Sequence, residues 1–340
     1  MKKTMKKALF CAVALCLALL ASCAPQGQAP ASQSPAPAAA SPAPSLEPER
    51  TERLAASDDS GIEPLPFAAL PAPLGGMSAE DYPVVDGSTA TRPLSQALAY
   101  YFTGITDMLE LDFLADHSTT DESYRNLLEK KVDLLLAYEP SPETRGIIER
   151  SGEEILMTPI GRDALVFLVN EKNPVKSLSL EQLQGIYSGK IKNWKEVGGE
   201  DLPIVAFQRP ENSGSQTLME KLVMKGKKMA EAPAELRQSE MGELIRAVAA
   251  FENEGSAIGY SVYYYASKMY AQEGVRLIAV NGAAPSAQSI ADASYPFLNE
   301  FYVAIRGEDS TNGPAAPLFE AITGETGKKI IEGMGYVPVR

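Results

Sequence analysis

Apolar and polar positions alternate in blocks that predict strands and helices in turn from about Asp81 onward. Short apolar runs are typical of buried strands; they are Tyr82–Val85, Val132–Ala137, Ala164–Val169, Ile204–Phe207, Ala257–Tyr260, Arg276–Val280 and Phe301–Ile305. The stretches that predict helices are Pro93–Phe102, Asp121–Lys130, Ser179–Tyr187, Gln216–Lys225, Gly242–Phe251, Ala315–Thr323 and Glu325–Gly333. This alternation predicts an α/β fold with mostly parallel sheets and ligands at the carboxyl ends of strands.

The first residues have the pattern of a targeting segment. Four lysines at positions 2, 3, 6 and 7 precede an apolar run, Ala8–Ala21, which is shorter than the roughly 20 residues of a membrane-spanning helix. The run ends in Leu20-Ala21-Ser22-Cys23, which resembles the lipobox of bacterial lipoproteins. That resemblance implies a signal peptide over residues 1–22, and a lipid, with acyl chains such as palmitate, on Cys23. The alternative is an ordinary secretory peptide with a chance cysteine.

Residues 24–50 contain eight Ala, seven Pro and four Ser. This composition cannot bury a core and predicts an extended chain. We expect residues 23–80 to form a disordered tether behind the lipidated Cys23. The protein is then expected at the extracytoplasmic face of the cell membrane, held by its lipid anchor.

Composition excludes several classes of function. The net charge is −13, from 31 Lys+Arg and 44 Asp+Glu, and loss of the leader with its four lysines makes it −17. Such an excess of acids argues against nucleic-acid binding, which needs clustered cations. The single His argues against a His-based metal site or a Ser-His-Asp triad. Cys11 and Cys16 leave with the leader and Cys23 takes the lipid, so no thiol chemistry remains.

Two loops share one design, in which an apolar strand is followed by a turn rich in small hydroxyl side chains and then by a helix. The first is Val84–Thr91, and the second runs from Ile204 through Arg209 to Ser215. The N-terminus of a helix presents unpaired N–H groups that accept anions. Arg209 adds a planar fork of donors that matches paired oxygens. The alternative for both loops is plain N-capping by Ser and Thr.

Several motifs resemble those of the phosphate-binding lipoproteins that serve bacterial phosphate ABC importers. The first is Asp86-Gly87-Ser88-Thr89-Ala90-Thr91, followed by Pro93. The others, in the family's order, are Ile160–Asp163, Val169-Asn170, Asn173–Val175, Ile186–Ile191, Asn193-Trp194, Gly198-Gly199, Ile258–Ser261 and Gly335–Pro338. The resemblance covers about Asp81 to Arg340. It implies a two-lobed, type 2 periplasmic-binding-protein fold, with lobe 1 formed by residues 81–163 and 260–340, lobe 2 by residues 164–259, and a ligand cleft between them.

The resemblance also implies which residues contact phosphate. In the first loop these are Ser88, Thr89 and Ala90, and before the Asp121 helix it is Thr120, or less securely Ser118 or Thr119. In the second loop Arg209, Ser213, Gly214 and Ser215 match the family's motif, with Glu211 where the family has Asp. Glu139 lies near its second acidic position. No catalytic residue, metal or cofactor is implied, and the partners are phosphate and an ABC-transporter permease, with the protein itself a monomer.

A carboxylate in an anion site favours phosphate over sulfate, because phosphate can still carry a proton to donate and sulfate cannot. Glu139 or Glu211 would be this selectivity residue; the alternative for each is a solvated loop glutamate. Two other functions stay open. One is a hydrolase with Ser213 or Ser215 as nucleophile, which lacks an evident base. The other is a surface sensor or adhesion module that binds another oxyanion or a phosphorylated ligand.

Overall fold

The computed structural model describes residues 65–251 and 255–339, which fall within one compact unit, Glu49–Arg340. The predicted signal peptide, the lipidation site Cys23 and residues 24–64 of the predicted tether lie outside the described residues. Within the described ranges, no helix is both long and apolar enough to span a membrane.

Strands and helices alternate along most of the described chain, as the sequence pattern predicts. The strands are β1 (Val85–Gly87), β2 (Leu134–Tyr138), β3 (Ile155–Asn170), β4 (Ser177–Leu178), β5 (Val205–Ala206), β6 (Ala257–Val262), β7 (Val275–Val280), β8 (Leu298–Arg306) and β9 (Val337–Pro338). The α-helices are α2 (Arg92–Thr103), α3 (Met108–Leu114), α4 (Thr120–Leu128), α5 (Pro142–Ser151), α6 (Leu180–Tyr187), α7 (Gly214–Leu218), α8 (Met241–Ala249), α9 (Ala287–Ala291), α10 (Asp309–Asn312), α11 (Ala316–Thr323) and α12 (Glu325–Gly333). Shorter turns of helix are η1 (Phe67–Ala69), η2 (Thr89–Thr91), η3 (Trp194–Val197), η4 (Met219–Met224), η5 (Ala234–Leu236) and η6 (Tyr265–Met269).

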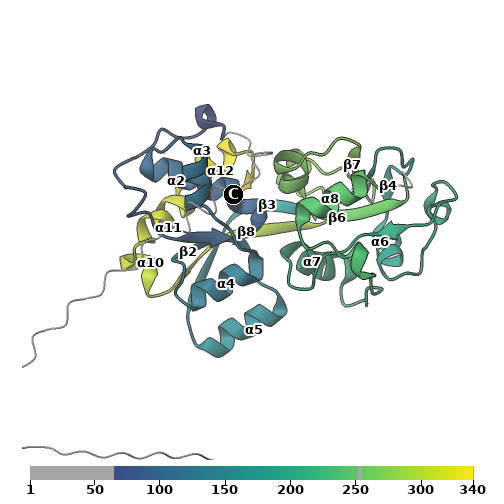
Figure 1. Ribbon diagram of the computed structural model, residues 1–340, viewed down its shortest axis with the longest axis horizontal. Coiled ribbons are helices and arrows are strands. Elements are labelled where there is room, and N and C mark those ends of the chain that lie inside the picture. Colours follow the sequence, from purple (N-terminus) through teal and green to yellow (C-terminus); the bar gives the residue numbers. More distant parts are fainter. Residues whose placement is uncertain (1–64, 252–254, 340) are drawn as a thin grey trace, which may run out of the picture. The chain divides into compact units, whose positions relative to one another are not determined.

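The long strand β3 belongs to two sheets at once. Its first part, Ile155–Ala164, pairs with β8, which pairs in turn with β2 and through it with β1. Its second part, Leu165–Asn170, pairs with β6 and β7. Figure 1 shows β3 leading from the group of helices α2, α11 and α12 to the group α6, α7 and α8. We call residues 65–163 and 298–339 lobe 1, and residues 164–297 lobe 2.

The pairing corrects the expectation of mostly parallel sheets. Among the strands of the described residues, only β1–β2, β5–β6 and β4–β7 are parallel pairs, whereas β3 is antiparallel to each of β6, β7, β8 and β9. Strand–helix alternation predicts parallel pairs when each helix returns the chain to a neighbouring strand. Here the chain instead passes between lobes along β3 and returns along β8. The α/β fold class is confirmed.

The second lobe boundary also differs from the expected one between residues 259 and 260. Strand β6 continues to Val262 and β7 follows it, and both pair with the part of β3 that lies in lobe 2. The chain re-enters lobe 1 only with β8, whose first residue, Leu298, pairs with Ala164. The apolar runs that identify β6 and β7 carry no information about which sheet they join.

The folded body begins earlier than the expected boundary at residue 81. Leu65 is 6% exposed and Tyr82 is buried in the same core cluster. The backbone N–H groups of Leu74 and Met77 donate to the carbonyls of Tyr101 and Phe102 at the end of α2. Residues 65–80 therefore pack on lobe 1, because apolar side chains return to the sequence after the Pro/Ala/Ser-rich stretch.

Local signals near the site are confirmed. Strand β2 is buried along its whole length, as its unbroken apolar run predicts. Helix α6 begins with the predicted capping box, in which Ser179 Oγ accepts from Gln182 N and the Gln182 side chain accepts from Ser179 N.

Candidate functional site

The loop after β1 places Ser88 in the interior of lobe 1. Gly87 is required before it, because an added Cβ at Gly87 would lie 1.9 Å from the Leu136 carbonyl oxygen. Ser88 precedes η2, but its side chain makes no capping bond. Its Oγ accepts from Tyr138 N at 3.0 Å and lies 2.8 Å from Thr120 Oγ1. The capping alternative therefore fails for Ser88, whose hydroxyl faces Thr120 instead.

Thr120 is the residue of the Ser118–Thr120 group that meets Ser88. Ser118 donates its hydroxyl and its backbone N–H to the carboxylate of Asp86, and Thr119 is exposed. Thr120 is buried at the first position of α4. Thr89 and Ala90 form the first positions of η2, which continues as α2, so their N–H groups have no acceptor within the helix.

His117 holds the backbone of the loop that carries Ser88. Burial lowers the pKa of His117 to about 4, so its ring is neutral at pH 7. The Nδ1–H group then donates to the Ser88 carbonyl at 2.8 Å, and Ser95 Oγ donates to Nε2 at 2.8 Å. The imidazole is used on both sides, which gives it a structural role.

Arg209 is buried with unused donors. Its side chain follows β5 and is 7% exposed. One guanidinium nitrogen, Nη2, donates to the Ser239 carbonyl at 2.8 Å, but Nε and Nη1 have no partner among the described residues. Burial lowers its pKa, while Glu240 and Tyr260 act in the opposite direction. Buried donors without acceptors are costly, so an acceptor supplied by a ligand would satisfy Nε and Nη1.

Ser213 and Ser215 take different roles in the same turn. Ser213 caps α7, because its Oγ accepts from Gln216 N at 3.3 Å. Ser215 is 3% exposed, and its Oγ has no partner among the described residues. The capping interpretation is thus confirmed for Ser213, whereas the Ser215 hydroxyl stays available to a ligand.

Gly214 brings the two lobes together. An added Cβ at Gly214 would lie 2.5 Å from Thr120 Oγ1 and 3.7 Å from Tyr138 Cδ2. The turn before α7 in lobe 2 therefore abuts the Ser88–Thr120 pair of lobe 1. The resemblance predicts the ligand in the cleft between the lobes, to which this contact belongs.

Residues 75–321 match the PBP superfamily domain. This chain belongs to the PBP superfamily. A curated relative, the phosphate-binding protein PstS of Bacillus subtilis, is 28% identical over 256 residues, which are 75% of this chain and 80% of the relative. The phosphate-binding protein PstS of Borreliella burgdorferi is 24% identical over 261 residues, or 75% of this chain and 89% of the relative.

Solved structures of the same fold include a phosphate ABC transporter substrate-binding protein from Clostridium perfringens with bound phosphate. It has a TM-score of 0.57 at 24% identity and covers 75% of this chain and 98% of its own. An ABC-type phosphate transport receptor from Vibrio cholerae has a TM-score of 0.55 at 23% identity, with 74% and 98% covered. These likenesses confirm the fold of this superfamily member.

The two candidate carboxylates, Glu139 and Glu211, share no contact among the described residues. Glu139 directly follows β2 and forms ion pairs with Lys221 and Arg145. Glu211 is exposed on the loop before α7. A contact of either glutamate with a bound anion stays a prediction.

Asp163 is a buried acid that the sequence analysis did not single out. One of its carboxylate oxygens accepts from Tyr138 Oη at 2.8 Å, and the other accepts from Tyr264 N and Ala164 N. Burial raises its pKa to about 6. Asp163 thus fixes the ring of Tyr138, which lies against Gly214. A charged residue at the head of a continuous apolar strand was the signal that could have identified it.

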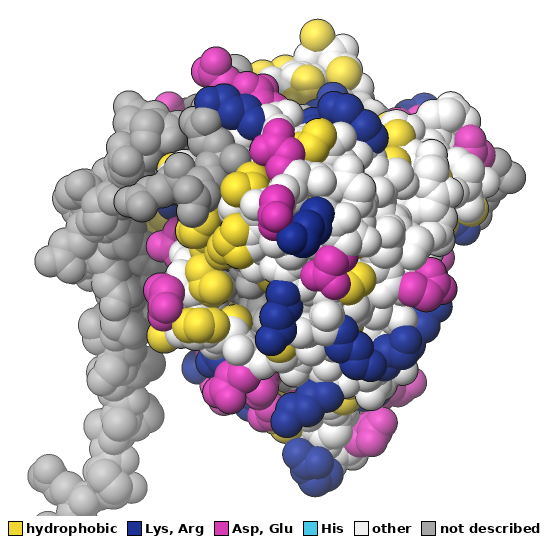
Figure 2. All heavy atoms as spheres, turned by 90° about the vertical axis from the view of Figure 1, so that its right-hand side faces the viewer, with side chains coloured by type: hydrophobic (Ala, Val, Ile, Leu, Met, Phe, Trp, Pro, Cys, Tyr) yellow, Lys and Arg dark blue, Asp and Glu magenta, His cyan; other side chains and the backbone are white. Residues whose placement is uncertain are grey.

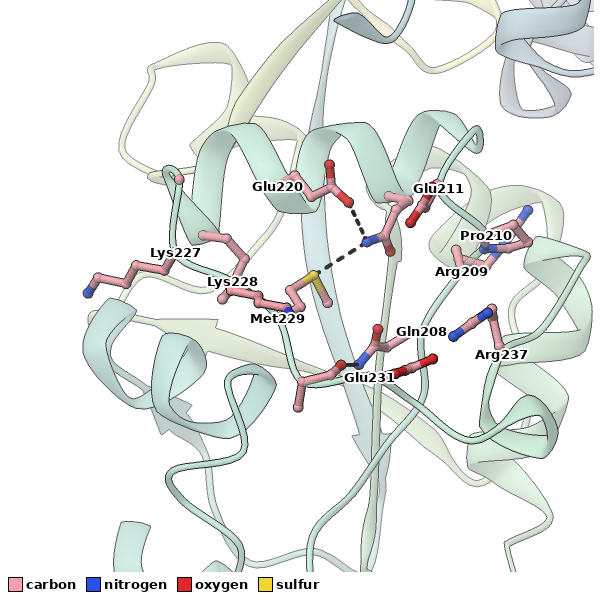
Figure 3. A pocket seen from close by; sticks show the side chains of 14 residues that line it. Gln208, Arg209, Pro210, Glu211, Glu220, Lys227, Lys228, Met229, Glu231 and Arg237 are labelled. Carbon is pink, nitrogen blue, oxygen red and sulfur yellow. Dashed lines mark hydrogen bonds between the residues drawn. The ribbon is translucent and has the colours of Figure 1, made fainter. Parts of the chain in front are cut away.

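A pocket of about 710 Å³ lies beside the second loop in this PBP superfamily member and includes Arg209 and Glu211 in its lining. Figure 3 shows Gln208, Met229, Glu231 and Arg237 around it, below the helix formed by α7 and η4. Its volume far exceeds that of one tetrahedral anion. Gln208 and Gln216 are already hydrogen-bonded within it, so we do not assign this pocket to the anion itself.

Proposed function

We propose that this protein captures inorganic phosphate between its two lobes, on the extracytoplasmic side of the membrane, and delivers it to the permease of an ABC importer. The observation that carries the proposal is the buried guanidinium of Arg209, whose Nε and Nη1 have no partner among the described residues. A guanidinium with two free N–H groups suits two oxygens of one tetrahedral anion.

The other proposed phosphate contacts supply hydroxyl and backbone donors from the first loop, the start of α4 and the second loop. They are the hydroxyls of Ser88, Thr120, Ser213 and Ser215 and the backbone N–H groups of Thr89, Ala90 and Gly214. Ser88 and Thr120 already lie within hydrogen-bonding distance of each other, so an anion would bind to a preorganised pair. The phosphate-binding relatives from Bacillus and Borreliella support the choice of phosphate among the tetrahedral anions.

A net charge of −13 for the whole chain does not oppose this function. Acidic and basic side chains are interspersed on the face that Figure 2 shows. Exposed charges are screened within about 8–10 Å at physiological salt, whereas Arg209 and the hydroxyls act at contact distance. Local donors therefore decide anion binding.

Selectivity is proposed to come from a carboxylate that accepts the proton of HPO₄²⁻. Glu139 and Glu211 are the two candidates that the sequence provides. A fully ionised sulfate would face the same carboxylate with lone pairs, at a cost of about 1–3 kcal/mol for the unpaired group.

Calorimetric titration of residues 23–340 with Cys23→Ser tests the function. Phosphate, arsenate, sulfate and molybdate are compared at pH 7. We expect phosphate to bind at least about tenfold more tightly than sulfate, which corresponds to about 1.4 kcal/mol. Equal affinities would contradict phosphate selectivity, and no heat with any oxyanion would contradict the function. A chromogenic phosphate ester in the same preparation tests the hydrolase alternative, which predicts turnover that Ser215→Ala removes.

Lipid anchoring through Cys23 is proposed from the sequence alone. Cells that express the whole chain are labelled with an alkyne analogue of palmitate and fractionated. The chain is expected to carry the label and to sediment with membranes, and Cys23→Ala is expected to lose both properties. A labelled Cys23→Ala chain would contradict lipidation at this position.

A further inference from the structure

A second contact between the two lobes, besides the Gly214–Thr120 contact, is an ion pair. Lys221 of η4, in lobe 2, pairs with Glu139, which follows β2 in lobe 1. On the same carboxylate, Arg145 of α5 lies with its Nη2 3.5 Å from Oε2. Glu139 is 18% exposed and Lys221 57% exposed. The carboxylate thus has one cation from its own lobe and one from the other lobe.

The surroundings of the pair are partly apolar. Leu218 and Leu222 flank Lys221 on the helix, and together with Tyr302 of β8 they line a cavity of about 350 Å³ that also includes Glu139 and Lys221. Low-dielectric neighbours strengthen a charge pair relative to a fully exposed one. Because Lys221 is 57% exposed, we expect the Lys221–Glu139 pair to contribute modestly, on the scale of a surface pair.

Only one of the two ion pairs depends on the arrangement of the lobes. Arg145 and Glu139 both belong to lobe 1, so their contact persists in any rigid-body motion of that lobe. Lys221 belongs to lobe 2, and a rotation about the β3 and β8 crossovers that parts the lobes would separate it from Glu139. The pair can then stabilise only the closed arrangement.

We propose that Lys221 is a positioning residue for phosphate capture, which raises the affinity by holding the lobes closed through Glu139 and makes no contact with the phosphate. The proposal rests on the proposed function. When only the closed state binds tightly, the apparent dissociation constant varies inversely with the closed fraction. Removal of the pair must then lower the ligand-free closed fraction and raise the phosphate Kd by the same factor.

This role differs from that of a selectivity residue, and the two make opposite predictions for sulfate. If Glu139 acts through Lys221, Glu139→Gln and Lys221→Gln both weaken phosphate and sulfate by equal factors. If Glu139 accepts a proton from phosphate, Glu139→Gln changes the ratio of the two affinities and Lys221→Gln does not.

The test combines calorimetry with distance measurement between the lobes. Residues 23–340 carry Cys23→Ser, and spin labels are attached at Glu122→Cys on α4 and Glu200→Cys in lobe 2, both exposed positions. Lys221→Gln is expected to lower the ligand-free closed fraction about 3- to 10-fold and to raise the phosphate Kd by the same factor. Lys225→Gln, which removes an exposed lysine from the same segment, is expected to change neither.

A double-mutant cycle completes the test. The Lys221→Gln/Glu139→Gln chain is expected to bind phosphate no more weakly than Glu139→Gln alone. Additive effects, an unchanged Kd in Lys221→Gln, or a shift in the phosphate-to-sulfate ratio in that variant would overturn the proposal. The spin-label distances are measured without phosphate, so they report on the pair even if the unchanged chain fails to bind phosphate.

Discussion

The backbone of Gly214 lies directly against the hydroxyl of Thr120, so that a single methyl group at residue 214 would come within 2.5 Å of Thr120 Oγ1. The two residues belong to different lobes, and their contact exists only when the lobes meet.

Gly214→Ala should therefore block closure without harming the fold. We expect the phosphate Kd to rise at least about tenfold, with the melting temperature unchanged or higher, because Ala is the better helix former. Calorimetry and thermal unfolding measure the two effects. Gly146→Ala is a matched control, since its Cβ would meet only the flexible end of Arg150 at 3.1 Å. A Gly214→Ala chain with unchanged affinity would contradict the placement of the ligand.

Arg209→Ala should remove the main anion contact and raise the phosphate Kd at least about 30-fold, or about 2 kcal/mol for a charge-assisted contact. Arg209→Lys keeps the charge but loses the fork, so an intermediate loss is expected. Arg237→Ala is the control, because this exposed arginine lines the neighbouring pocket and donates to the Ala232 carbonyl. Equal increases of the phosphate Kd in both alanine variants would show that Arg209 is not the main anion contact.

Of the two serines in the turn before α7 that are proposed to contact phosphate, only Ser213 should also contribute to the stability of the unliganded protein. Ser215→Ala removes a hydroxyl without a described partner, so the unliganded protein should keep its stability while the phosphate Kd rises about tenfold or more. Ser213→Ala removes the α7 cap and should cost about 1 kcal/mol of unfolding free energy. Urea unfolding and titration of both variants measure the split. The reverse pattern would mean that the two roles have been exchanged.

Asp163 should make stability fall as pH rises through its titration range. Burial raises its folded pKa to about 6, from an ordinary value of 3.8. Between these values the folded state binds the proton and the unfolded state does not, so stability decreases toward higher pH, by on the order of 3 kcal/mol. The unfolding free energy of Asp163→Asn minus that of the unchanged chain, measured by urea unfolding, should therefore increase from pH 4 to pH 6.5.

The comparison with Asp163→Asn is needed because His117 titrates in the opposite sense. Its folded pKa is lowered to about 4, so its contribution is lost as the pH falls from about 6.5 to 4. Asp201→Asn is a control of opposite sign, since the Lys195 side chain lowers the pKa of that exposed carboxyl. Parallel pH curves for Asp163→Asn and the unchanged chain would show that Asp163 is not titrating.

Features that depend on neighbours in the chain were predictable from the sequence. The capping box of α6 needs only Ser179 and Gln182 three residues apart. The order of the strands was not predictable, because β8 pairs between β2 and β3, although about 130 residues separate it from β3 in the chain. An apolar run predicts that a strand is buried, but it does not predict with which strand it pairs.

The candidate site likewise has features that the sequence predicts and features that depend on residues far apart in the chain. Ser88, Thr120 and Gly214 meet as the resemblance implies. The choice of Thr120 over Ser118 depends on Asp86, which binds the Ser118 hydroxyl from 32 residues away. Asp163 acts through Tyr138 and Tyr264, which are 25 and 101 residues distant. Such partners become visible only in three dimensions.

The position of β8 in the chain has a consequence for biosynthesis. It lies between β2 and β3 in the sheet of lobe 1, yet it spans Leu298–Arg306, near the carboxyl end. While a ribosome or a secretion channel still holds those residues, lobe 1 lacks its central strand and cannot close its core. Lobe 2, encoded between, can complete its sheet first. The order of the strands in the chain thus delays the final folding step until almost the entire polypeptide has been released.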